Sequence, residues 1–273
     1  VRAGTADEVV RLLEEHGEAA RLMMGGTDLF VGMRDGVARP RIVVDVKHLS
    51  GMRDVVYDEQ SGLTVGAAAT MNEIAHHSDV QAHCPLLADA ANSVASYQVR
   101  NRATIGGNLC NASPCADTVP VTLVLEGSVV LYGPGGEREL PAGEFFTGPG
   151  ETALGADELM TAIRYPALPP GAAGRYLKLG RSKIGDLAIV SAAVLGFPDD
   201  VAPSGYRFRV ALGSVAPVVL RVPAAEEVLA ENPPGEGAFA LAAEKAVEAA
   251  SPIDDVRGSA AYRSAMVRQL TRR

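Results

Sequence analysis

The chain has 273 residues, of which 47% are hydrophobic and 21% are charged, as in globular proteins that bury a sizeable core. Its net charge of −8 disfavours partners such as nucleic acid or an anionic membrane surface. No apolar run approaches the roughly 20 residues of a membrane-spanning helix, and the three cysteines, Cys84, Cys110 and Cys115, cannot all pair, so we expect a reducing cytoplasm. Neither Met nor a basic and apolar leader precedes Val1, so we expect a trimmed N-terminus.

Residues 1–51 predict a helix followed by a small β-α-β unit. Thr5-Ala6-Asp7-Glu8 is a capping-box pattern that begins the helix. The apolar run 21–24 predicts a buried strand, after which Thr27 caps a short helix. The run 41–46 (RIVVDV) predicts the second strand of the unit.

Residues 52–167 predict a sheet with helices. The expected strands are 63–66, 128–132 and 159–165, and the expected helices are 71–75 (capped by Thr70), 85–94 and 118–125 (capped by Asp117). The glycine-rich segments 133–136 and 148–150 predict hairpin turns.

The segment 166–171 (PALPPG) is the clearest domain boundary. We therefore expect one domain at 1–167, with subdomains 1–51 and 52–167, and a C-terminal domain at 172–273. The sequence of the C-terminal domain predicts antiparallel strands at 175–180, 189–197, 206–212 and 217–220. It also predicts helices at 224–230, 239–250 and 259–272. The predicted fold class is α+β.

Two glycine pairs carry the functional signal, in Met24-Gly25-Gly26-Thr27-Asp28 and in Thr104-Ile105-Gly106-Gly107-Asn108. Glycine lacks a Cβ, so the backbone can turn and approach a ligand closely. Successive N–H groups in such a loop favour an anion such as phosphate. Two such loops predict one extended phosphate-bearing ligand held at both ends, although neither is a GxGxxG or Walker A sequence.

Cys110 and Cys115, with the His and Cys residues between 76 and 84, raise the alternative of a metal site. Neither a CxxC pair nor four matched ligands are present. We therefore favour small residues packed in a tight loop, and expect no metal in this chain.

Five stretches stand out in chain order: 24–29 (MGGTDL), 98–109 (QVRNRATIGGNL), 112–118 (ASPCADT), 176–188 (YLKLGR and DLA) and 251–259 (SPIDDVRGS). Together they resemble the FAD-binding medium subunits of molybdenum hydroxylases, the relatives of xanthine dehydrogenase, carbon monoxide dehydrogenase and 4-hydroxybenzoyl-CoA reductase. The four-cysteine insertion of the last branch is absent. The resemblance implies a two-subdomain FAD-binding (PCMH-like) domain followed by a C-terminal domain of antiparallel sheet plus helices.

The resemblance also implies the FAD-binding residues. They are Leu22, Met23, Met24, Gly25, Gly26, Thr27, Asp28, Leu29, Thr104, Gly106, Gly107, Asn108, Ala116, Asp117, Leu159, Lys178 and Leu187. The stretch 22–29 would wrap the pyrophosphate and ribityl chain, and the second glycine pair would approach the diphosphate from the other side. Asp117 would bind sugar or ribityl hydroxyls. Leu159 and Lys178 would line the adenine or flavin environment, and Leu187 would lie near the isoalloxazine ring.

The function implied is that of an oxidoreductase subunit that transfers electrons. Electrons would pass from 2Fe-2S clusters of a small subunit through FAD to an external acceptor, and a large subunit would hold the molybdenum cofactor. A heterotrimer or its dimer is expected, with no catalytic acid or nucleophile in this chain. The organic substrate and the acceptor (NAD, oxygen, quinone or another carrier) stay open. The alternatives are a stand-alone FAD-dependent oxidoreductase of the related oxidase or reductase type, and a nucleotide-binding interaction module.

Overall fold

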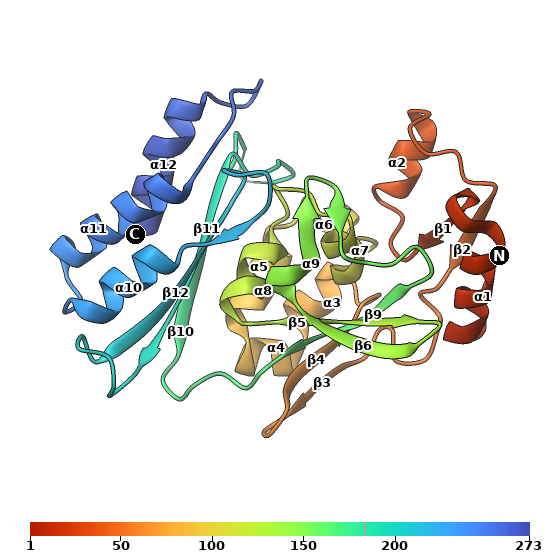
Figure 1. Cartoon of the computed structure of the whole chain (residues 1–273), viewed down its shortest axis with the longest axis horizontal. Helices are drawn as coiled ribbons and strands as arrows, with labels where there is room; N and C mark the ends of the chain where they lie inside the picture. Colours follow the sequence, from red (N-terminus) through yellow and green to blue (C-terminus); the bar gives the residue numbers. More distant parts are fainter. Residues whose placement is uncertain (183) are drawn as a thin grey trace.

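The computed structural model describes residues 1–182 and 184–273 (Figure 1). At the N-terminus, α1 (Ala6–His16) packs on a parallel pair of strands, β1 (Ala20–Met23) and β2 (Ile42–Asp45), with the 3₁₀ turn η1 (Gly17–Ala19) before β1. Thr5 caps α1 as predicted, since its Oγ1 accepts the N–H of Glu8.

The short helix between β1 and β2 is α2 (Leu29–Arg34). The prediction that Thr27 caps it is wrong. Asp28 occupies the N-cap position with helical dihedral angles, and neither side chain accepts a bond from the helix. The Thr27 hydroxyl lies 3.4 Å from the Asp28 carboxylate instead. The backbone donors of this first turn are therefore not satisfied by capping side chains.

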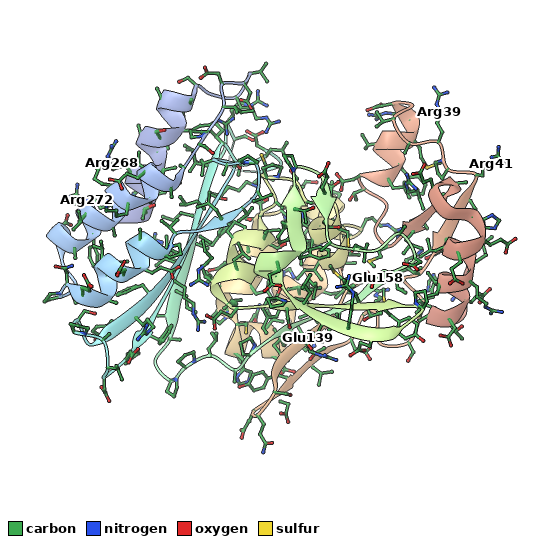
Figure 2. All side chains as sticks on the ribbon, in the orientation of Figure 1. Arg39, Arg41, Glu139, Glu158, Arg268 and Arg272 are labelled. Carbon is green, nitrogen blue, oxygen red and sulfur yellow. The ribbon has the colours of Figure 1, made fainter. Side chains whose placement is uncertain are left out.

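The central sheet has the order β3-β4-β9-β5-β6 and is antiparallel throughout. Its strands are β3 (Val55–Asp58), β4 (Gly62–Gly66), β5 (Ser128–Gly133), β6 (Gly136–Pro141) and β9 (Leu159–Tyr165). The predicted turns at 133–136 and 148–150 connect β5 to β6, and β7 (Phe146–Gly148) to β8 (Glu151–Thr152). Charged residues occupy the edge at β6, where Glu139 pairs with Arg164 (2.5 Å) and Glu158 with Arg138 (2.6 Å; Figure 2).

Short helices cover this sheet. They are α3 (Met71–His76), α4 (Ser78–His83), α5 (Pro85–Ser93), α6 (Tyr97–Arg100), α7 (Ile105–Cys110), α8 (Thr118–Val124) and α9 (Ala142–Phe145). Thr70 and Glu73 form a capping box at α3, as the predicted cap requires. None of the helices that the structure describes is long and apolar enough to span a membrane.

The C-terminal sheet has the antiparallel order β10-β11-β12-β13. Its strands are β10 (Ala173–Leu179), β11 (Val190–Pro198), β12 (Tyr206–Gly213) and β13 (Leu220–Arg221). The helices α10 (Pro223–Glu231), α11 (Glu236–Ala249) and α12 (Ala260–Arg272) follow. This arrangement confirms the predicted α+β fold with a C-terminal antiparallel sheet and helices.

The two faces of the C-terminal sheet belong to different hydrophobic cores. Ala193 and Leu195 of β11 join the large core that contains the central sheet and α5. Ala192, from the other face, joins a second core with α10, α11 and α12. Figure 1 shows the sheet standing between these helices and the rest of the molecule. Alternation along each strand therefore decides which residues reach the N-terminal part of the chain.

Candidate functional site

The fold packs the first glycine segment against residues 102 and 103, directly before the second one. A Cβ built on Gly25 would lie 2.2 Å from the carbonyl oxygen of Arg102 and 3.2 Å from the Cα of Ala103. Only glycine leaves room for this approach. The first segment therefore packs on the chain immediately before Thr104.

The first glycine segment presents free backbone donors. The N–H groups of residues 25 to 29 donate to no acceptor within the part of the chain that the structure describes. Gly26 has a φ of +78°, the left-handed conformation that turns the chain between β1 and α2. A run of donors in such a turn creates an electropositive concavity that suits a phosphate group.

The second segment differs from the expectation of a loop with available N–H groups. It is the first turn of α7, and its N–H groups are already used. Ile105 donates to the Ala69 carbonyl (3.1 Å) and Gly106 to the Ala67 carbonyl (2.8 Å). Gly107 donates to Thr104 Oγ1, which caps the helix (3.2 Å). The donors this segment can offer to a ligand are therefore side chains.

Asn108 is the side chain best placed for that role. Its Oδ1 accepts the hydroxyl of Thr118 (2.6 Å), which fixes the amide beside the start of α8. Its Nδ2 has no partner among the described residues, so two N–H donors remain for a ligand. Thr118 directly follows Asp117, and this contact links the second glycine segment to the next predicted site residue.

Asp117 and Lys178 form a buried ion pair between the N-terminal part and the C-terminal sheet. Lys178 Nζ lies 2.7 Å from Asp117 Oδ2 and donates to the Ser93 carbonyl (3.0 Å). The Tyr176 hydroxyl donates to Asp117 Oδ1 (2.7 Å). Asp117 is only 6% exposed, and burial raises its pKa although the Lys178 charge opposes that rise.

The expected capping role of Asp117 is wrong, because its carboxylate makes no bond to the start of α8. Tyr176 was missed by the sequence analysis. Its signal is the spacing from Lys178, since residues two apart on a strand share a face. Burial and the neighbouring Asp117 raise the pKa of its phenol well above the usual value, so it donates rather than ionises.

A cavity of about 480 Å³ adjoins this pair. The end of α5, the α6 region and the segment after β10 line it, with Lys178, Tyr97 and Asp186 among the lining residues. Buried Arg100 shapes its wall by donating to Asn72 Oδ1 (3.1 Å) and to the Val94 carbonyl (2.9 Å). Polar and apolar groups both line the cavity, which lies beside the ion pair.

The remaining predicted residues have different surroundings. Leu22 and Met23 are half-buried in β1, and Met24 is buried directly after it. Ala116 is 4% exposed and Leu159 is completely buried, where it pairs with Tyr132 in the central sheet. Successive contacts therefore run from the first glycine segment to residues 102 and 103, from Asn108 to Thr118, and from Asp117 to Lys178, whereas Leu159 lies inside the core.

Leu187 is half exposed on the segment between β10 and β11. The same segment touches the N-terminal part of the chain, where the Gly185 N–H donates to the Ala95 carbonyl (3.2 Å). Leu187 therefore lies on the segment that borders the cavity beside Lys178, although it is not one of the residues that line it.

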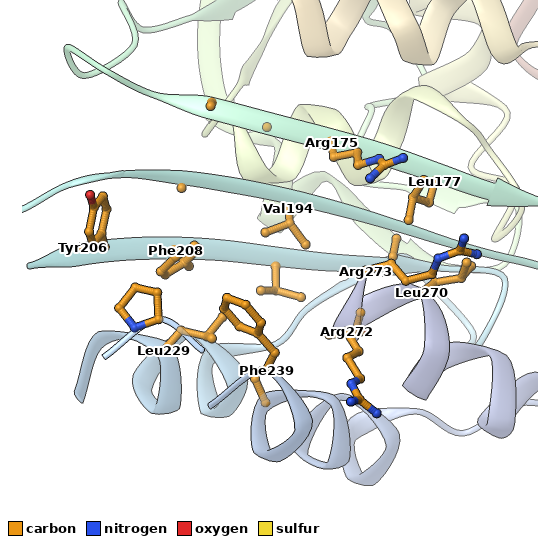
Figure 3. Close-up of a pocket in the computed structure, with 18 of the residues that line it drawn as sticks. Arg175, Leu177, Val194, Tyr206, Phe208, Leu229, Phe239, Leu270, Arg272 and Arg273 are labelled. Atoms are coloured by element: carbon orange, nitrogen blue, oxygen red, sulfur yellow. The ribbon is translucent and has the colours of Figure 1, made fainter. Parts of the chain in front are cut away.

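A second cavity, of about 500 Å³, lies on the opposite face of the C-terminal sheet (Figure 3). Val194 and Phe208 of the sheet and Leu229 and Phe239 of the helices line it. Because the sheet separates it from Tyr176 and Lys178, it is not part of the site described above.

The cysteines do not gather ligands for a metal. Across the residues that the structure describes, no three His, Cys, Asp or Glu side chains are grouped to hold an ion. Burial raises the pKa of Cys84 to about 11 and that of Cys110 to about 12, so both thiols stay protonated at neutral pH.

Two family models together match nearly the whole chain. The model for the FAD binding domain in molybdopterin dehydrogenase matches residues 1–168, and that for the CO dehydrogenase flavoprotein C-terminal domain matches residues 175–273.

Similar proteins agree with these matches. The carbon monoxide dehydrogenase medium chain of Hydrogenophaga pseudoflava is 36% identical over 97% of this chain and 91% of its own length. The xanthine dehydrogenase FAD-binding subunit of Escherichia coli O157:H7 is 30% identical over 100% of this chain and 92% of its own length. A solved structure of the Hydrogenophaga pseudoflava carbon monoxide dehydrogenase superposes with a TM-score of 0.94 at 34% identity, covering 99% of this chain and 93% of that one. The chain therefore belongs to the family of FAD-binding subunits of molybdopterin dehydrogenases, which are oxidoreductases, as its motifs predicted.

Proposed function

We propose that this chain is the medium subunit of a molybdenum hydroxylase and passes electrons from the 2Fe-2S clusters of a small subunit through FAD to an external acceptor. The observation that carries the proposal is the run of unused N–H donors at residues 25 to 29, packed against the segment that carries Asn108. A dianionic diphosphate matches such a run of backbone donors.

The residues present fit FAD. Residues 25 to 29 would hold the pyrophosphate through their N–H groups, and the Asn108 amide would add side-chain donors from the facing segment. Asp117 receives bonds from Lys178 and Tyr176, yet a carboxylate offers about four acceptor positions, so hydroxyl groups of the ribityl chain or ribose can still bind it. Its negative charge makes sugar hydroxyls, rather than phosphates, the suitable partners.

FAD, when bound, would supply a redox centre that takes up electrons singly and releases them in pairs. The chain's own residues would bind and orient it. Lys178 would place its side-chain nitrogen beside the cavity, held there by Asp117 and the Ser93 carbonyl. Within the C-terminal domain of residues 172–273, Leu187 would lie near the isoalloxazine ring, on the exposed segment after β10.

A partner surface adjoins the proposed site. Four segments expose large apolar side chains: α2 with the turn after it, α6, the segment after β10 and the segment before α12. These residues are Phe30, Val31, Val37, Tyr97, Val99, Ile184, Leu187, Ile253 and Val256. In Figure 1, α2 lies at the upper right and the start of α12 at the upper left, with α6 between them near the middle of the molecule. Exposed apolar patches mark interaction sites, which supports docking of the iron–sulfur and molybdenum subunits in a heterotrimer or its dimer.

FAD binding is tested by Asn108→Asp. The substitution keeps the acceptor for Thr118 but removes the amide donors and adds a negative charge facing the diphosphate. Losing a charge-assisted bond of about 1.5–3 kcal/mol predicts a loss of FAD affinity of about 10- to 100-fold. The affinity is measured by flavin fluorescence as FAD is added back to the flavin-free chain. The matched control is Asn111→Asp, at the exposed C-terminal end of the same helix.

Equal FAD affinity in the Asn108→Asp variant and the wild-type chain would refute the assignment of the diphosphate. The assembly is tested separately by native mass spectrometry of the purified complex. We expect two further subunits, 2Fe-2S clusters and the molybdenum cofactor. A chain that oxidises a substrate with no partner would instead support the stand-alone FAD oxidoreductase.

A further inference from the structure

The buried arginine Arg263 lies outside the site, but it contacts two residues that are hydrogen-bonded to the backbone near Lys178 and near Asp117. Arg263 of α12 is 2% exposed. Its Nη1 donates to the carbonyl oxygens of Ile189 (2.5 Å) and Ser214 (3.1 Å), and its Nη2 lies 2.7 Å from Asp255 Oδ1. A guanidinium presents several donors in a rigid fork, so one side chain can hold three acceptors at fixed positions.

Ile189 and Ser214, whose carbonyl groups accept from Arg263, each donate their own N–H to a residue near the ion pair. The Ile189 N–H donates to the Leu179 carbonyl (2.7 Å), which directly follows Lys178. The Ser214 N–H donates to the Pro114 carbonyl (2.8 Å), in the turn that leads to Asp117. Arg263 is thus connected, through one residue in each direction, to the backbone beside both members of the ion pair.

The conformation of Ser214 shows that this connection is a constraint. Its φ is +67°, a left-handed conformation that costs a non-glycine residue about 1–3 kcal/mol and persists only where surrounding contacts enforce it. The bonds to Arg263 and Pro114 are such contacts. Arg257 lies in residues 251–263, the stretch before and at the start of α12 that also contains Arg263. Its Nη1 reaches the turn before Asp117, where it lies 3.5 Å from Cys115 Sγ.

We propose that Arg263 is a positioning residue for the site: it fixes the distance between the strand that carries Lys178 and the turn that carries Asp117. Residues 251–263 would then hold the backbone near Lys178 and Asp117 in position without contacting the bound cofactor. The effect of Arg263 on FAD binding rests on the proposed function, whereas its effect on the order of the backbone does not.

The test compares Arg263→Lys with Val267→Ala. Lysine keeps the charge, but its single ammonium cannot replace the fork. Val267 is fully buried one turn further along α12 and shares a hydrophobic core with Ile189. Its truncation weakens the packing of the same helix but leaves the hydrogen bonds from Arg263 to the two carbonyl groups in place. Amide hydrogen exchange is measured on the chain without FAD. We expect exchange about ten-fold faster in segments 186–190 and 112–118 in Arg263→Lys alone, as a local loss of about 1.4 kcal/mol would produce.

Exchange that rises only in α12 and the second core, or that rises equally in Val267→Ala, would overturn the proposal. In a second measurement, Arg263→Lys should lower FAD affinity about ten-fold, against less than two-fold for Val267→Ala at a temperature where both are folded. Loosened segments with unchanged FAD affinity would also overturn it. A wild-type chain that binds no FAD would instead count against the proposed function, because the exchange result is independent of the cofactor.

Discussion

Replacing Lys178 by Met would leave the Asp117 carboxylate buried without its cation. Methionine has nearly the length of lysine, so the substitution removes the charge and two hydrogen bonds while largely preserving the packing. The Lys178 side chain is 15% exposed and that of Asp117 is 7% exposed, so solvent screens the pair little.

The expected cost is that of breaking a buried pair, about 3–5 kcal/mol. Domains of 150–250 residues lose about 2–4 °C in Tm per kcal/mol, so the transition should fall by about 6–20 °C. The loss should also depend on pH. Burial raises the pKa of Asp117 in the folded chain, and removing Lys178 raises it further.

An acid whose pKa is raised on folding adds stability below its unfolded pKa and loses that stability as the pH rises through the folded value. The Lys178→Met variant should therefore be closer to the wild-type chain at pH 5 than at pH 8.

Thermal unfolding by calorimetry at these two pH values measures the effect. The control is the double variant Lys178→Met with Asp117→Asn, which removes both charges and leaves an amide oxygen for Tyr176. It should recover most of the lost stability, because neutral replacement of a buried pair is often nearly free of cost. A Lys178→Met variant within 1 kcal/mol of the wild-type chain, the range of exposed pairs, would refute the reasoning. So would a double variant no more stable than the single one.

Two further outcomes follow from packing and burial. Gly25→Ala would place a Cβ 2.2 Å from the Arg102 carbonyl oxygen and should cost about 1–3 kcal/mol in urea unfolding, whereas Gly135→Ala, with nothing within 4 Å, should change stability by less than about 0.5 kcal/mol. Equal effects would contradict the close contact between Gly25 and the Arg102 backbone. Cys84 and Cys110, with pKa values raised to about 11 and about 12, should resist alkylation at pH 8 and react after unfolding, as mass spectrometry would show. Rapid labelling of either thiol in the folded chain would contradict its raised pKa.

Much of the site could be predicted because its residues fall in compact stretches of sequence. The contacts of those residues could not. Asp117 precedes α8 and has the composition of a helix cap, but its partner Lys178 lies 61 residues further along the chain. A buried carboxylate gains more from that cation than from capping a helix. Tyr176 and Arg263 were missed for the same reason, since their partners are distant in sequence.

Local patterns in the sequence by themselves determined the α+β composition, most strands and the helix caps at Thr5 and Thr70. Such features depend on neighbouring residues, whose spacing the sequence states directly. Only the tertiary structure decided which glycine pair keeps free donors. Carbonyl groups of Ala67 and Ala69 take the N–H groups at the start of α7, whereas those of residues 25 to 29 meet no acceptor among the described residues. Both pairs have the same local chemistry, so the difference arises only when the central sheet brings a distant backbone against one of them.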